Sequence, residues 1–120
     1  MTPKQFQKYL DRDGGCIHCG ETESVAPHHR LNRGMGGSKV RDVPSNIIVL
    51  CSAMNSLLES DAGIATTGRE NGWKLRSGQD PKTTPVWLPM QGLWAFLGDG
   101  YDVTNVRREP NADYQEPTRL

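Results

Sequence analysis

The stretch Ser24-Val25-Ala26-Pro27-His28-His29-Arg30-Leu31, followed later by Asn46-Ile47-Ile48-Val49-Leu50-Cys51, decides the fold. The first segment predicts a short strand that carries two adjacent histidines. The second is a β-branched, apolar run, which predicts a buried strand. Residues 32–45 contain three glycines and a proline, which predict a loop. The pattern is therefore two strands joined by a glycine-rich segment.

A helix is expected directly after the second strand, capped by Ser52 and ended by Gly72. Its apolar face holds Met54, Leu57, Leu58 and Ala65. Asn55 and Glu59 share the polar face, because residues four apart are neighbours on a helix surface. The polar face can therefore present an amide and a carboxylate to the preceding strands.

The N-terminal segment predicts a helix that packs on the core and carries no catalytic residues. Thr2, Pro3 and Gln5 form a helix start with a capping box, and Gly14 with Gly15 ends this helix. Its apolar stripe consists of Phe6, Tyr9 and Leu10.

Beyond Gly72, short strands are expected over 73–75, 85–88 and 93–97, with a turn at Gly98-Asp99-Gly100. The three tryptophans of this half are expected to pack a small antiparallel sheet rather than to stack on bases. The prediction is an α+β fold in one domain over residues 1–106, followed by a polar, disordered tail over 107–120.

Bulk composition narrows the classes of protein. The chain has 120 residues, of which 35% are hydrophobic, and no apolar run long enough for a membrane span or a signal peptide. A cytoplasmic protein is therefore expected. Its three cysteines favour metal ligation or burial over a disulfide framework, since the number is odd.

Charge is balanced overall, with 14 basic and 14 acidic residues, but it is unevenly distributed. Residues 25–41 contain no acid. Within them lie four basic residues that could meet phosphate: Arg30, Arg33, Lys39 and Arg41. A chance cluster is the alternative explanation of this charge pattern.

Neighbouring residues on a strand point to opposite sides, so one of His28 and His29 can face the helix while the other faces elsewhere. One imidazole and one amide oxygen would leave most positions around a metal ion to water and phosphate. That arrangement suits Mg²⁺ or Mn²⁺. The other imidazole, if it binds no metal, can accept a proton from water. Together these parts would suffice for phosphodiester hydrolysis.

His28-His29, Asn46 and Asn55 resemble the motif of HNH endonucleases in its HNN variant, and most of all the short HNH proteins of bacteriophages. The resemblance covers about 13–61 and includes the Cys16-x-x-Cys19 pair and the glycine-rich loop. It implies a ββα-metal (His-Me finger) core between the N-terminal helix and the C-terminal sheet.

The resemblance also implies residue roles. His29 would be the general base, His28 a metal ligand, and Asn55 the second ligand in place of the motif's last histidine. Asn46 would hold the loop and the backbone that position His29. Glu59 is either a further ligand or an exposed helix glutamate.

A zinc site is the open question of the resemblance. Many relatives hold a structural zinc with two Cys-x-x-Cys pairs, whereas here Met54 stands where a fourth thiolate is expected. One alternative is a site of Cys16, Cys19 and Cys51 with a substitute ligand such as His18. The other is a remnant pocket without zinc, in which Met54 fills the gap.

The expected function is a Mg²⁺- or Mn²⁺-dependent DNA endonuclease that nicks or cuts both strands. The phage resemblance adds DNA processing or packaging, with a large terminase subunit as a partner, by analogy only. Two rival readings remain. One is a DNA-binding module without turnover on the same scaffold, and the other is a non-catalytic assembly protein.

Overall fold

Helices and two small antiparallel sheets make up the computed structural model, which describes residues 1–32 and 41–106. The fold is α+β, as predicted from the sequence. The elements of the described part, in chain order, are α1 (Pro3–Asp13), β1 (Val25–His29), the 3-10 turn η1 (Pro44–Asn46), β2 (Ile47–Cys51), α2 (Ser52–Ser60), α3 (Ala62–Glu70), β3 (Val86–Leu88), β4 (Leu93–Leu97) and β5 (Val103–Asn105). The expected tail over 107–120 lies outside the described residues.

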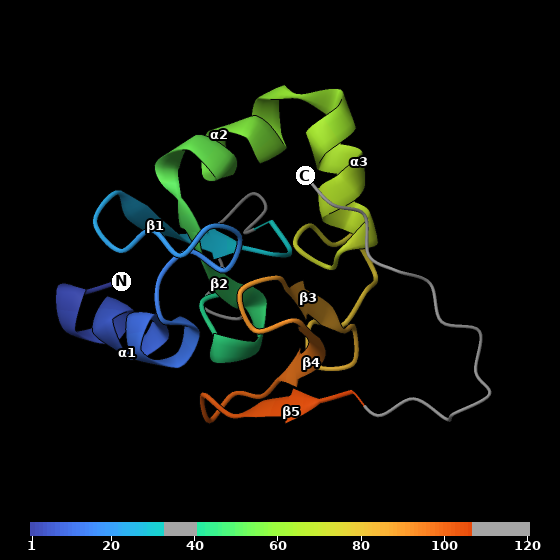
Figure 1. The fold of residues 1–120 in the computed structure, drawn as a ribbon. Helices are drawn as coiled ribbons and strands as arrows, with labels where there is room; N and C mark the ends of the chain where they lie inside the picture. Colours follow the sequence, from blue (N-terminus) through green and yellow to red (C-terminus); the bar gives the residue numbers. More distant parts are fainter. Residues whose placement is uncertain (33–40, 107–120) are drawn as a thin grey trace.

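The first sheet pairs β1 with β2 in antiparallel register, so that His28 lies opposite Ile48 and His29 opposite Ile47. Residues 47–50 of β2 are completely buried. Because side chains alternate along a strand, β2 contributes to two apolar clusters: Ile48 and Leu50 to one, Ile47 and Val49 to the other. The sheet therefore lies in the centre of the molecule, between α1 and the second sheet (Figure 1).

Helix α1 forms as its sequence predicts. Thr2 and Gln5 make the reciprocal capping box, and Gly14 ends the helix in the left-handed region at φ 75°. Tyr9 packs on Ile47 and Val49. At the end of the helix, Asp13 accepts a hydrogen bond from the backbone N–H of Val49 at 3.0 Å. This buried carboxylate thereby fixes α1 to β2.

The prediction of one continuous helix from Ser52 to Gly72 is wrong, because the chain breaks at Asp61. This residue is extended, and its carboxylate accepts a hydrogen bond from Ile64 N at 3.0 Å, which caps α3. Helix α3 then packs against α2 (Figure 1). Gly68 allows close packing there, since a Cβ at this position would lie 2.5 Å from Leu58 Cδ2.

The second sheet has the order β3-β4-β5, with both pairs antiparallel. Its buried residues Val86, Leu88, Ala95 and Leu97 join the larger core cluster. Trp87 and Trp94 pack on each other with ring centroids 5.7 Å apart, which agrees with the predicted packing role.

The strand expected over 73–75 does not form. Its backbone N–H groups donate instead to Gly68 O and Arg30 O, so the segment closes the end of α3.

Candidate functional site

His28 and Asn55 face each other across the β1–α2 junction. His28 lies on β1 and is only 4% exposed, whereas Asn55 is the fourth residue of α2. Helix α2 begins at the residue after β2, which carries it over the neighbouring strand. As a result, His28 Nδ1 lies 3.3 Å from Asn55 Oδ1. The pairing predicted from strand and helix periodicity is therefore present in space.

The other ring nitrogen determines the tautomer of His28. Its Nε2 lies 2.8 Å from the backbone carbonyl of Trp73, and a carbonyl can only accept, so Nε2 carries the proton. Burial lowers the pKa of His28 and favours the neutral ring. The lone pair of Nδ1 then points at the amide oxygen of Asn55.

An electropositive group between these two acceptors could bind both of them. Ligand distances of about 2.0–2.1 Å to Mg²⁺ place adjacent octahedral ligands about 3 Å apart. The 3.3 Å between Nδ1 and Oδ1 is close to that value. His28 and Asn55 therefore fit two adjacent ligand positions of one small divalent cation, with water or substrate oxygens completing the shell.

His29 follows His28 on β1, and its ring contacts a different partner from the His28–Asn55 pair. Its Nε2 lies 2.5 Å from Oδ1 of Asp42, and the two side chains are 19% and 30% exposed. A carboxylate at Nε2 favours a proton on that nitrogen and leaves Nδ1 as the acceptor. The sequence analysis did not identify Asp42 as a partner of His29. The one available signal was its position in the predicted loop, four residues before Asn46.

One open cavity of about 300 Å³ brings the candidate residues together. Its lining consists of Pro27, His28, His29, Asn32, Asn55 and Glu59. Glu59 is 57% exposed, and one of its oxygens lies 3.4 Å from Lys74 Nζ. No ligand role follows for Glu59 from this contact, and both readings of it stay predictions.

Asn46 is completely buried and ties together the two ends of the glycine-rich segment. Its Nδ2 donates to the carbonyls of Leu31 and Arg41, both at 3.0 Å, and its Oδ1 accepts from Leu31 N at 2.8 Å. Leu31 lies two residues after His29, and Arg41 directly precedes Asp42. Asn46 can therefore hold both partners of the His29–Asp42 contact in place.

Arg30 was predicted to contact DNA, and this prediction is wrong. The side chain is completely buried. Its guanidinium donates to four backbone carbonyls, those of Ser45, Gly72, Pro81 and Thr84. A guanidinium enclosed in this way cannot reach a phosphate, and it serves instead to join four segments of the chain.

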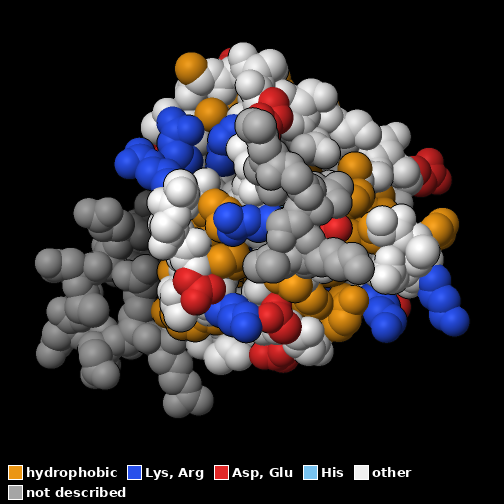
Figure 2. Space-filling view, turned by 180° about the vertical axis from the view of Figure 1, so that it is seen from behind, with side chains coloured by type: hydrophobic (Ala, Val, Ile, Leu, Met, Phe, Trp, Pro, Cys, Tyr) orange, Lys and Arg blue, Asp and Glu red, His pale blue; other side chains and the backbone are white. Residues whose placement is uncertain are grey.

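The other basic residues of the predicted cluster give little information. Arg33 and Lys39 lie outside the described residues, and Arg41 is partly buried. In Figure 2, Lys and Arg side chains gather at the upper left of the described face, and further down positive and negative side chains lie next to one another.

Cys16, Cys19 and Cys51 converge at the other end of the β1–β2 pair, with all three sulfur atoms within 4.8 Å of one another. Tetrahedral zinc with bonds of about 2.3 Å holds its sulfurs about 3.8 Å apart, so this cluster could hold a metal ion. A backbone hydrogen bond at Glu21 lowers the pKa of the Cys19 thiol, whereas burial raises that of Cys16.

The fourth position of this cluster is not filled by a histidine among the described residues. His18 meets Trp73 edge-on, with centroids 5.9 Å apart. Met54 is 6% exposed in the core beside Cys16, and its backbone N–H donates to Cys51 Sγ at 3.4 Å. A buried Met54 agrees with the apolar-plug reading, and the three thiols agree with the metal reading.

Comparison with known proteins gives no relative. No family model, no curated protein and no solved structure matches this chain. Within residues 1–32 and 41–106, no helix has the length and apolar character needed to cross a membrane.

Proposed function

We propose that this chain is a metal-dependent endonuclease that hydrolyses phosphodiester bonds of DNA, with a ββα-metal centre of the HNH type built from β1, β2 and α2. One observation carries the proposal. His28, His29 and Asn55 line a single cavity, in which two acceptor atoms face each other at 3.3 Å. The resemblance of the same residues to the HNN motif supports it independently of the geometry.

The roles follow from the contacts. His28 Nδ1 and Asn55 Oδ1 would hold Mg²⁺ or Mn²⁺, and the bound ion would supply positive charge to the scissile phosphate and the leaving oxygen. His29 takes the proton of the attacking water on Nδ1. Asp42 accepts the hydrogen bond of Nε2 and thereby orients the ring.

A non-catalytic DNA-binding module is the second candidate. It is favoured by Asn55 itself, because an amide oxygen is a weaker metal ligand than an imidazole and would leave the ion loosely held. Service in phage DNA packaging, with a large terminase subunit as a partner, stays a prediction of the resemblance alone. The same holds for a cytoplasmic location.

Supercoiled plasmid separates these candidates. We expect the protein to convert this plasmid to the open or linear form in Mg²⁺ or Mn²⁺, and we expect cleavage to stop when EDTA is added. Asn55→Leu, which keeps the volume but removes the oxygen, should lose most of this activity. The matched control is Val103→Ala, since Val103 is an exposed residue of β5 outside the cavity.

Each outcome of the plasmid assay favours or contradicts a particular candidate function. A salt-dependent shift of intact plasmid on a gel, with no cleavage in either metal, would contradict the enzyme and favour the binding module. Neither cleavage nor a shift would contradict both and favour an assembly role. Cleavage that persists in EDTA would contradict the metal centre.

A further inference from the structure

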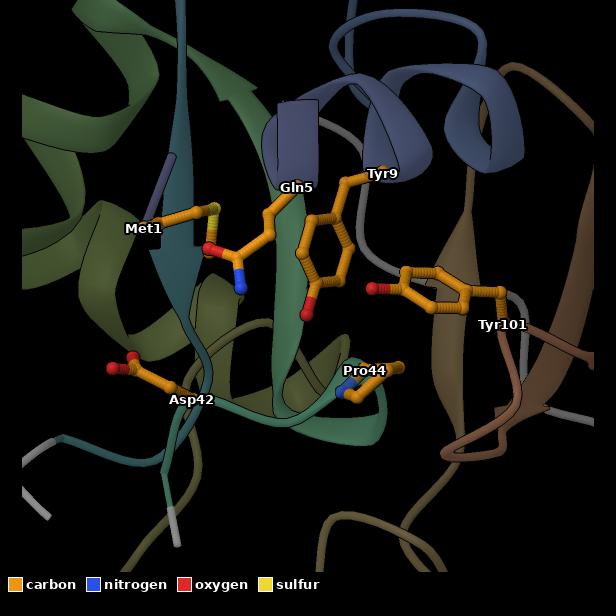
Figure 3. A pocket seen from close by; sticks show the side chains of 6 residues that line it. All are labelled: Met1, Gln5, Tyr9, Asp42, Pro44 and Tyr101. Atoms are coloured by element: carbon orange, nitrogen blue, oxygen red, sulfur yellow. The ribbon is translucent and has the colours of Figure 1, made fainter. Parts of the chain in front are cut away.

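A second cavity, of about 350 Å³, lies between α1 and the turn that leads into β5. Its lining consists of Met1, Gln5, Tyr9, Asp42, Pro44 and Tyr101 (Figure 3). Asp42 belongs to this lining and also contacts His29, which lines the first cavity. The second cavity therefore begins directly behind the proposed general base.

Two aromatic side chains form one wall. The rings of Tyr9 and Tyr101 lie 5.2 Å apart and are tilted by 56°. Tyr101 has a φ of 62° and is the one non-glycine residue in the left-handed region among those described. Such a backbone is unfavourable for a side chain of this size, and strain of this kind is concentrated at ligand contacts.

Polar groups of both kinds belong to the lining. The oxygen of the Gln5 amide accepts from Thr2 N at 2.8 Å as part of the capping box, which turns the amide nitrogen toward the cavity (Figure 3). Asp42 brings a carboxylate to the same lining, and this carboxylate also accepts the hydrogen bond of His29. A donor and an acceptor set beside aromatic rings match the face and the edge of a nucleobase.

Positive charge lies beside the same wall. Lys8 Nζ lies 5.6 Å from the centroid of the Tyr101 ring, and Lys4 precedes Lys8 by one turn of α1. Both lysines are exposed. They could contact the phosphates that flank a nucleotide whose base occupies the cavity.

We propose that this cavity, defined by Gln5, Tyr9, Asp42 and Tyr101, binds the nucleobase of a nucleotide next to the scissile phosphate. The inference rests on the proposed function for its place in the reaction. A base can enter only after it leaves the stack, and unpaired nucleotides make that step cheapest. The preferred substrate is therefore DNA with an unpaired nucleotide beside the cut. Thymine is the least favoured base, since it has no exocyclic amine to donate to Asp42.

Cleavage tests this on duplexes that share one sequence and differ in a single unpaired A, C, G or T. We expect cuts next to the unpaired position, at least about tenfold faster than in the fully paired duplex, and slowest for T. Tyr101→Ala should reduce this advantage to a few-fold or less, and Tyr101→Phe should keep most of it. The matched control is Val103→Ala, an exposed residue two positions along the same turn and strand.

Binding gives a readout that does not depend on turnover. In ¹H–¹⁵N spectra of the wild-type protein in EDTA, added dAMP should shift the amides of residues around the cavity, and dTMP should shift them less. Tyr101→Phe, which keeps the ring, should respond as the wild type does.

The two proposals fail in different ways. Cuts without preference for unpaired nucleotides, or no shifts around the cavity with dAMP, would overturn the base pocket and leave the nuclease intact. Shifts around the cavity without cleavage of any DNA would overturn the nuclease and leave the base pocket.

Discussion

The proposed chemistry depends on Asp42, although no sequence pattern pointed to this residue. Its carboxylate accepts from His29 Nε2 across a separation of 13 residues, in a segment whose ends are tied by Asn46. A carboxylate at this position determines which nitrogen of the base is free to accept a proton. In the proposed mechanism, Asp42 is thus a positioning residue for His29.

Asp42→Asn should lower kcat by about 10²–10⁴-fold with little change in KM. The asparagine amide can donate to Nε2, which places the proton on Nδ1 and blocks it as a base. Asp42→Glu should recover part of the rate, because it restores an acceptor. Equal loss in both variants, together with a raised KM, would show that Asp42 serves DNA binding rather than the orientation of His29.

Arg30 also acts at the residue scale, through stability rather than chemistry. We expect Arg30→Met to reduce the free energy of unfolding by about 3 kcal/mol, because four backbone carbonyls lose their donor in the interior. Urea denaturation would measure this, with exposed Arg76→Met as the control. A loss equal to that of the control would show that water replaces the guanidinium.

The elements of the first half were largely predictable, because their signals are local. The capping box of α1 and the apolar run of β2 each lie within a few residues. The break at Asp61 was missed because the apolar spacing continues across it, and the cap of α3 became visible only with the backbone geometry. The strand expected over 73–75 failed for the opposite reason: its partners, Gly68 O and Arg30 O, are contacts that no local pattern encodes.

The same difference between local signals and long-range contacts explains which parts of the site were predicted. His28 and Asn55 lie 3.3 Å apart, since a strand followed at once by a helix leaves few geometries open, and their role as metal ligands stays a prediction. Arg30 looked like a DNA contact because it lies in a basic stretch. Its four carbonyl acceptors come from positions between 45 and 84, and only the tertiary fold brings them together.

The loop before β1 and the end of β2 make a further prediction at the element scale. Since three thiols converge there, purified protein should contain zinc at close to one equivalent by elemental analysis. Removal of that zinc should lower Tm, and Cys19→Ser should reduce the zinc content. Zinc-free protein whose Tm is insensitive to chelator would instead establish Met54 as a simple plug.

At the scale of the whole molecule, burial of a neutral histidine makes stability depend on pH. Burial lowers the pKa of His28 in the folded chain below its value of about 6.5 in the unfolded chain. Between these two values the unfolded state binds more protons. The contribution of His28 to stability is therefore complete above about pH 6.5 and is lost as pH falls toward the folded value.

Urea denaturation in EDTA between pH 7.5 and 5 would show this loss, with a slope of at most about 1.4 kcal/mol per pH unit from this group. His28→Gln removes the titrating ring and should flatten that part of the curve. If wild type and His28→Gln lose stability in parallel, then His28 does not control the acid response.

The central claim is that one imidazole acts as a base beside a cation held by His28 and Asn55. Its most direct test is the single-turnover rate of DNA cleavage in Mn²⁺ for wild type and His29→Ala, with DNA and Mn²⁺ affinities measured in parallel. The account predicts a rate at least about 10²-fold lower in His29→Ala at nearly unchanged affinities. A rate within a few-fold of wild type would contradict it.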